Sequence, residues 1–166
     1  MSNLVLTGVI DGPLADGLPR AIQLYVREDI ADLSTYGLGS ANNGNGSVGA
    51  EFTFPAQPAS KGSYLYVSTE STGFASYFGF APDFVSSSAA SINGDDAIEL
   101  FQNGVLVDVF GDVNVDGTGR PIPFRRRALP SRRHWSSTRC WVRPLAPIPS
   151  SSNWWAGQAS RWRDTA

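Results

Sequence analysis

The stretch Ile92–Gly119, INGDDAIELFQNGVLVDVFGDVNVDGTG, decides the fold of this chain of 166 residues. Two apolar runs, Ala97–Phe101 and Val105–Phe110, flank the dipeptide Asn103-Gly104. Asn-Gly is a strong hairpin signal, because both residues tolerate the positive φ that a type I′ turn requires. We therefore predict a β-hairpin with a two-residue turn at the centre of the domain.

The two-residue loop also predicts the register of this hairpin. The pairs are Phe101 with Leu106, Leu100 with Val107, Glu99 with Asp108, and Ile98 with Val109. Because side chains alternate across a strand, four aliphatic residues share one face, which we assign to the core: Ile98, Leu100, Val107 and Val109. The register also sets Glu99 opposite Asp108, which is unfavourable for two like charges. A cation or an arginine would offset this repulsion; alternatively, both carboxylates point into water or a bulge separates them.

Other short segments with strand-like composition precede the hairpin, and turns rich in Gly, Pro, Asn and Asp separate them. We predict strands over Asn3–Ile10, Arg20–Val26, Glu51–Pro55 and Ser63–Thr69. The intervening segments are a short helix or irregular crossing over Glu28–Tyr36, a loop over Gly37–Gly49, and a short helix within Gly73–Phe84. Short strands at regular spacing favour an all-β sandwich.

Charge divides the chain into two unlike parts. Residues 1–119 contain three basic and 14 acidic residues, whereas residues 120–166 contain ten basic residues, one acidic residue and all five tryptophans. The strand-like periodicity also ends near Gly119. We expect a domain over residues 3–119 and a tail rich in Arg, Pro, Ser and Trp over residues 120–166. Our hypothesis is that this tail is disordered or the product of out-of-frame translation; the rival interpretation is a genuine basic tail.

Six short motifs in residues 3–119 carry a family resemblance. They are Ile22-Gln23-Leu24-Tyr25; Ala31-Asp32-Leu33 to Tyr36 and Leu38; Phe52-Thr53-Phe54-Pro55; Gly62 to Leu65-Tyr66-Val67; Gly94-Asp95-Asp96-Ala97-Ile98-Glu99-Leu100; and Asn103-Gly104 through Val107-Asp108. In this order they resemble the lamin-tail domain, an immunoglobulin-like β-sandwich. The resemblance implies a noncatalytic domain, which in bacteria is attached to secreted or surface proteins, including extracellular nucleases and phosphatases.

We therefore expect an all-β, immunoglobulin-like β-sandwich with a short helix or two and an irregular C-terminal tail. The expected function is noncatalytic binding or targeting, within a longer bacterial secreted or surface protein, and the ligand is a protein, polysaccharide or nucleic-acid surface. One alternative is a fragment of an extracellular nuclease or phosphatase whose catalytic domain is absent. A second alternative is a nucleic-acid binder whose tail arginines contact phosphates and whose tryptophans stack on bases.

The N-terminus and the hydropathy of the chain limit where it acts. The first residues, MSNLVLTGVIDGPL, lack the basic region and the long apolar stretch of a signal peptide. No run of about 18 apolar residues occurs, so we expect no membrane span. We expect an extracellular or cell-surface location only as part of a longer protein.

Asp112, Asn114 and Asp116 form the one candidate metal site in the sequence. With Gly117 they have the D-x-N-x-D-G spacing of a calcium loop, in which alternating oxygen ligands wrap a hard cation. The twelfth position of the loop is Pro123, where a bidentate glutamate is needed. The alternative interpretation is a turn rich in Asx residues after the hairpin, and we expect either Ca²⁺ or no cofactor.

Catalysis has little support in the sequence. Asp95 and Asp96 read as a turn that leads into a strand rather than as paired carboxylates. The only histidine, His134, lies in the tail with no acidic residue nearby, and Cys140 is the only cysteine. For binding, the candidates are Tyr64 and Tyr66, whose side chains alternate away from apolar neighbours and so face outward.

Overall fold

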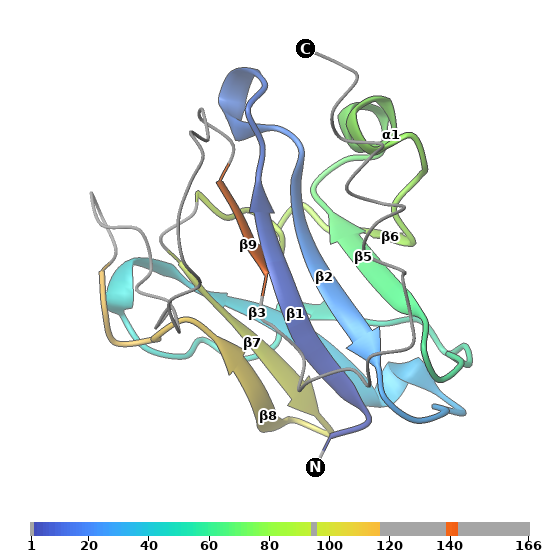
Figure 1. Ribbon diagram of the computed structural model, residues 1–166. Coiled ribbons are helices and arrows are strands. Elements are labelled where there is room, and N and C mark those ends of the chain that lie inside the picture. Colours follow the sequence, from blue (N-terminus) through green and yellow to red (C-terminus); the bar gives the residue numbers. More distant parts are fainter. Residues whose placement is uncertain (1, 94–95, 117–138, 143–166) are drawn as a thin grey trace, which may run out of the picture.

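The computed structural model describes residues 2–93, 96–116 and 139–142, and these residues form two β-sheets (Figure 1). The five-stranded sheet has the strand order β6-β5-β2-β1-β9, and the four-stranded sheet has the order β4-β3-β7-β8. The two sheets bury one shared core and so form a sandwich with little helix, which confirms the predicted fold class. No helix in these three ranges is both long and apolar enough to cross a membrane.

Nine strands, one α-helix and three short 3₁₀ turns make up the described elements. The strands are β1 (Leu4–Asp11), β2 (Arg20–Val26), β3 (Tyr36–Ala41), β4 (Phe52–Thr53), β5 (Tyr64–Ser68), β6 (Phe84–Val85), β7 (Ala97–Gln102), β8 (Val105–Phe110) and β9 (Arg139–Val142). The helical elements are α1 (Thr72–Phe78) and the 3₁₀ turns Ala15–Gly17, Leu33–Thr35 and Asn42–Gly44.

The core lies between the sheets and contains mostly aliphatic side chains. The largest fully buried side chains are those of Phe54, Phe74, Phe110, Leu4, Leu6, Ile22, Leu24, Leu33, Leu38, Ile92, Ile98 and Leu100. All of these except Phe74 belong to the shared core between the sheets. Burying each such side chain contributes roughly 1.5–3 kcal/mol. The alternating apolar residues of the predicted strands therefore supply most of the inner faces.

A register shift in β1 keeps its apolar residues on the inner face. The pairing of β1 with β2 shifts between Leu6 and Gly8: an advance of two residues along β1 lies opposite an advance of one residue along β2. The bulge explains why the inward residues are Leu4, Leu6 and then Val9, three positions later. The imperfect alternation of the first predicted strand is therefore the signature of this bulge.

The central hairpin forms where it was predicted, but its register was predicted wrongly beyond the first pairs. Phe101 does lie opposite Leu106, but a bulge then sets Leu100 opposite Asp108, Glu99 opposite Val109 and Ile98 opposite Phe110. The turn residue Asn103 has the expected positive φ of 51°. The Asn-Gly dipeptide therefore predicts the position of the turn but not the strand register beyond the bulge.

The bulge also corrects the predicted core face of the hairpin. Ile98 and Leu100 are fully buried, as expected, but Val107 is 37% exposed and Val109 is only partly buried. Phe110 takes the inner position instead and is 0% exposed. The bulge also separates the two hairpin carboxylates, which was one of the predicted alternatives: Asp108 pairs with Leu100 rather than with Glu99.

The predicted loop over residues 37–49 is wrong at its start, where strand β3 lies in the middle of its sheet. β3 pairs with β7 on one side and β4 on the other, and all of its residues are buried. Its small residues allow another part of the backbone to approach closely: a Cβ at Gly39 would collide with the carbonyl oxygen of Gly49. Glycine marks close backbone contact here, although its abundance predicted a loop.

One strand comes from the segment that was predicted to be a tail. β9 pairs antiparallel with the second half of β1, where Ile10 lies opposite Cys140 and Asp11 lies opposite Arg139. These four residues extend the five-stranded sheet, which differs from the expectation that all of residues 120–166 lie apart from the sandwich. The other residues of that segment, including His134, lie outside the described part of the chain.

Candidate binding surface

Helix α1 lies on the outer face of the five-stranded sheet, near one end of β5 and β2 (Figure 1). Phe74 of this helix is fully buried in a second cluster with Ile10 and Ala21 of the sheet, and Tyr66 and Phe78 pack against that cluster. This cluster lies on the opposite side of the sheet from the main core. The sheet therefore buries apolar side chains on both faces at this end.

Local hydrogen bonds fix the two ends of α1. The Glu70 carboxylate accepts hydrogen bonds from the backbone N–H groups of Gly73 (2.7 Å) and Phe74 (3.1 Å) at the start of the helix. The helix ends at Gly79, whose φ of 79° is left-handed and suits glycine. The chain then turns back across the sheet and presents Phe80, which is 45% exposed.

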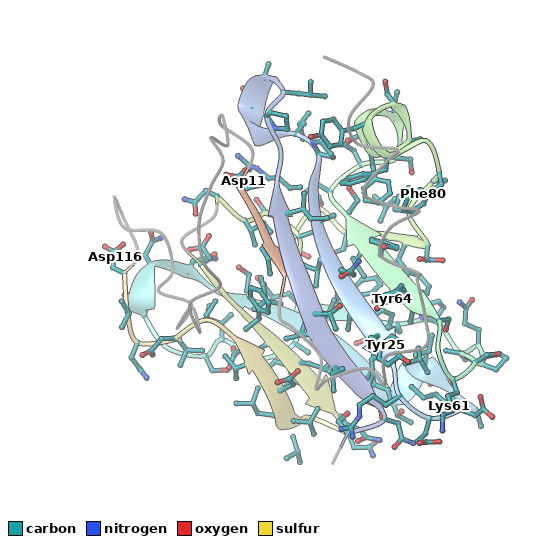
Figure 2. The ribbon with its side chains drawn as sticks, viewed as in Figure 1. Asp11, Tyr25, Lys61, Tyr64, Phe80 and Asp116 are labelled. Atoms are coloured by element: carbon teal, nitrogen blue, oxygen red, sulfur yellow. The ribbon has the colours of Figure 1, made fainter. Side chains whose placement is uncertain are left out.

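Four aromatic side chains lie on the outer face of this sheet, and we call them the aromatic surface: Tyr25, Tyr64, Tyr66 and Phe80. Figure 2 shows Phe80 near α1 and shows Tyr64 and Tyr25 toward the far end of β5. The Tyr66 and Phe80 rings meet edge-on with centroids 5.2 Å apart. The Tyr25 and Tyr64 rings lie on paired strands with centroids 5.0 Å apart. Tyr64 is 42% exposed, and Tyr25 and Tyr66 are partly exposed.

A hydrogen-bond chain holds Tyr66 in place on this surface. The Gln23 side-chain amide donates to the Tyr66 hydroxyl at 2.8 Å, and the Thr7 hydroxyl donates to the Gln23 side-chain oxygen at 3.1 Å. The backbone N–H of Tyr66 donates to the Asp83 carboxylate at 2.7 Å, where the short strand β6 leaves the edge of β5 uncovered. The Tyr66 hydroxyl is therefore held by the Gln23 side chain, and the Tyr66 backbone is held by Asp83 at the strand edge.

The charges near the aromatic surface are mainly acidic. At its far end the Lys61 ammonium donates to both Glu28 carboxylate oxygens at 2.9 Å. This hydrogen bond, followed by the attraction between the two charges, raises the pKa of Lys61. Partial burial, followed by the neighbouring Tyr25 and Tyr66 side chains, raises the pKa of Tyr64.

The structure brings the two predicted binding tyrosines onto one face and adds two partners that the sequence analysis missed. Tyr25 pairs with Tyr64 across β2 and β5. Because Tyr25 follows the apolar Leu24 in the strand, alternation alone could have predicted that its side chain faces outward. Phe80 follows α1 outside any strand, so no alternation pattern could place it. Only the fold of the α1–β6 connection brings Phe80 beside Tyr66.

Asp116, the last of the three predicted calcium-binding residues, is labelled in Figure 2 beside the end of β3, far from the aromatic surface. The Asp112 carboxylate accepts a hydrogen bond from the Asn114 N–H at 3.0 Å, which is the hydrogen bond of an Asx turn. The segment packs against the 3₁₀ turn after β3, where Gly46 N–H donates to the Val113 carbonyl at 2.9 Å. Within the described ranges no group of three or more His, Cys, Asp or Glu side chains is arranged to hold a metal ion. Calcium binding stays a prediction.

The acidic pair Asp95-Asp96 is described only at its second residue. Asp96 is 4% exposed, and its carboxylate accepts a hydrogen bond from the Asn43 N–H at 3.1 Å. It thereby links the start of β7 to the 3₁₀ turn that follows β3. This contact is the kind expected of a turn that leads into a strand.

No protein-family model matches this chain, and no curated protein or solved structure matches it either.

Proposed function

We propose that this protein is a noncatalytic binding module of the lamin-tail type, that it serves a longer bacterial secreted or surface protein, and that the aromatic surface contacts its ligand. One observation carries the proposal: on one face of a sheet whose other face is buried in the core, Tyr64 and Phe80 are exposed and each contacts a partly exposed tyrosine. Aromatic rings that gather on a surface mark interaction sites, because they give contact area at a low cost in side-chain entropy.

The rigidity of this surface supports a binding role. Tyr25 and Tyr64 stand on paired strands, and the side chain of Tyr66 is held by Gln23. A ligand therefore meets rings that are already ordered, so binding loses little further conformational entropy. The motifs that resemble the lamin-tail domain support the assignment to a module that acts for attached domains.

The exposed apolar residues at the tip of the hairpin, Val105 and Leu106, are the competing surface. They are 64% and 45% exposed, but they lie on the four-stranded sheet and are aliphatic. Aliphatic side chains contribute less often than aromatic ones to the dominant contacts of an interface. They therefore serve as the control surface.

The test measures retention of the full chain on a panel of immobilised ligands: cellulose, chitin, double-stranded DNA and gelatin. The proposal predicts that Tyr64→Ala weakens retention on at least one of them by about tenfold, the range of an interface hot spot. The control variant Val105→Ala should bind like the wild type. If Tyr64→Ala and the wild type are retained equally on every member, the aromatic surface is not the binding site.

A further inference from the structure

We infer that the ligand of the aromatic surface is a neutral polysaccharide chain that lies along β5, with Tyr25 and Phe80 as contact residues in addition to Tyr64 and Tyr66. This inference rests on the proposed binding function and narrows its ligand to one chemical class. It is carried by the spacing of the rings, the polar groups between them and the charges around them.

The rings form two pairs that succeed one another along the strand. Tyr64 and Tyr66 are two residues apart on β5, which separates them by roughly 7 Å because each residue of a strand advances about 3.3 Å. Tyr25 stands beside Tyr64, and Phe80 stands beside Tyr66, at the ring-centroid distances of 5.0 Å and 5.2 Å. Such a row suits an extended ligand with repeating flat apolar faces, and a pyranose chain presents its C–H faces in this way.

Polar groups accompany the rings without adding charge. The Tyr66 hydroxyl is tied to Gln23, and Gln23 is tied to Thr7, so neutral donors and acceptors lie beside the ring edges. The Tyr64 hydroxyl, like any tyrosine hydroxyl at neutral pH, both donates and accepts hydrogen bonds. Sugar hydroxyls need this mixture of donors and acceptors next to an apolar platform.

Charge argues against a polyanionic ligand at this surface. Asp83 flanks Tyr66, and Glu28 flanks the Tyr25 end, where it already binds the Lys61 ammonium. The Lys61 ammonium near Tyr25 is already paired with the Glu28 carboxylate. Phosphate or sulfate groups would meet carboxylates here, whereas nucleic-acid surfaces are recognised by clustered lysine and arginine. An uncharged chain meets no such repulsion.

The experiment is isothermal titration calorimetry of the full chain with cellohexaose, xylohexaose, chitohexaose and mannohexaose, and with a heparin oligosaccharide and single-stranded DNA as anionic probes. At least one neutral oligosaccharide should bind, with an affinity that changes less than twofold when NaCl rises from about 50 to about 500 mM, since no ion pairs form. Tyr64→Ala and Tyr25→Ala should each weaken this binding by about tenfold.

Two further variants separate loss of contact from loss of folding. Tyr64→Phe keeps the ring and should bind within about threefold of the wild type, because only one hydroxyl contact is lost. Val105→Ala should bind unchanged. Binding that is lost equally in Tyr64→Phe and Tyr64→Ala, or that survives in Tyr64→Ala, overturns the inference.

The outcomes also separate this inference from the proposed function. If none of the neutral oligosaccharides binds, while Tyr64→Ala still weakens retention on DNA or gelatin, the ligand class is wrong and the binding surface stands. If Tyr64→Ala changes neither the titrations nor any retention on the immobilised panel, both proposals fail.

Discussion

The Leu6 backbone N–H in β1 donates to the Asp108 carboxylate in β8 at 2.9 Å, a contact between residues 102 positions apart. Leu6 lies next to the bulge of β1, and Asp108 lies next to the bulge of β8. β9 pairs with β1 only from Gly8 onward. The Leu6 N–H lies before this pairing begins, and the Asp108 carboxylate accepts its hydrogen bond instead. Two local irregularities therefore join the edges of the two sheets.

Replacing Asp108 should weaken this closure of the sandwich. Asp108→Ala removes the acceptor of the Leu6 N–H and should lower the free energy of unfolding by about 1–3 kcal/mol, the usual cost of leaving such a group unpaired. Asp108→Asn keeps one acceptor oxygen and should cost less. Urea denaturation measures both, with the exposed loop variant Val48→Ala as the control; equal midpoints for Asp108→Ala and Val48→Ala would contradict this role.

Glu99 is expected to reduce the stability of the fold. Its side chain is 0% exposed, and within the described part of the chain neither carboxylate oxygen has a hydrogen-bond partner. Because a buried carboxylate without a partner is costly, Glu99→Gln should raise the free energy of unfolding by about 1 kcal/mol at neutral pH.

The matched control for Glu99 is Glu51, whose carboxylate accepts a hydrogen bond from the Ser40 N–H at 2.8 Å. Glu51→Gln should leave the urea midpoint unchanged or lower it. If Glu99→Gln destabilises the protein more than Glu51→Gln does, the Glu99 carboxylate has a stabilising role that the structure does not explain.

Strand β9 allows a test of whether part of residues 120–166 belongs to the folded sandwich. β9 is an edge strand whose N–H groups face β1 and the open edge in turn, so the double variant Cys140→Pro/Trp141→Pro removes one N–H that faces β1 and should destabilise the sandwich if this segment pairs with β1 as the structure shows. Cys140→Ser is the control for loss of the thiol. Thermal unfolding temperatures that are the same for both variants would mean that the segment does not contribute to the stability of the fold.

Alkaline pH should reveal the environment of Tyr64. Burial raises the pKa of its phenol above the ordinary value of 10.0, so the folded state holds this proton more tightly than the unfolded chain. The stability due to this group is therefore present below pH 10 and is lost as the pH rises through the raised pKa. Tyr64→Phe should gain in stability relative to the wild type above pH 10 and not below it, as measured by urea denaturation; a constant difference would contradict the shift.

The sequence predicts the inner faces of this fold better than its irregular positions. Alternation predicts that Tyr64 and Tyr66 face outward, and their apolar neighbours Leu65 and Val67 are buried, because a two-residue period leaves one choice of face once one side is buried. The errors at Val107 and at Gly39 share one cause. A bulge and a close backbone approach are set by backbone contacts between neighbouring segments, and the alternation of apolar and polar residues does not encode them.

The binding surface was partly predictable for the same reason. Tyr64 and Tyr66 face outward by alternation alone, and pairing of β2 with β5 brings Tyr25 beside Tyr64. Phe80 joins the aromatic surface only because α1 packs its Phe74 against the sheet and the chain then returns past Tyr66. Its position therefore follows from tertiary packing.

The central claim is that ligand meets the outer face of β2 and β5, and a backbone amide NMR titration tests it most directly. The full chain, labelled with ¹⁵N, is titrated with the neutral oligosaccharide that binds most tightly in calorimetry. The account predicts saturable shift changes concentrated at Gln23, Tyr25, Tyr64 and Tyr66, with none at Val105 and Leu106. Changes concentrated at the hairpin tip, or spread evenly over both sheets, would contradict it.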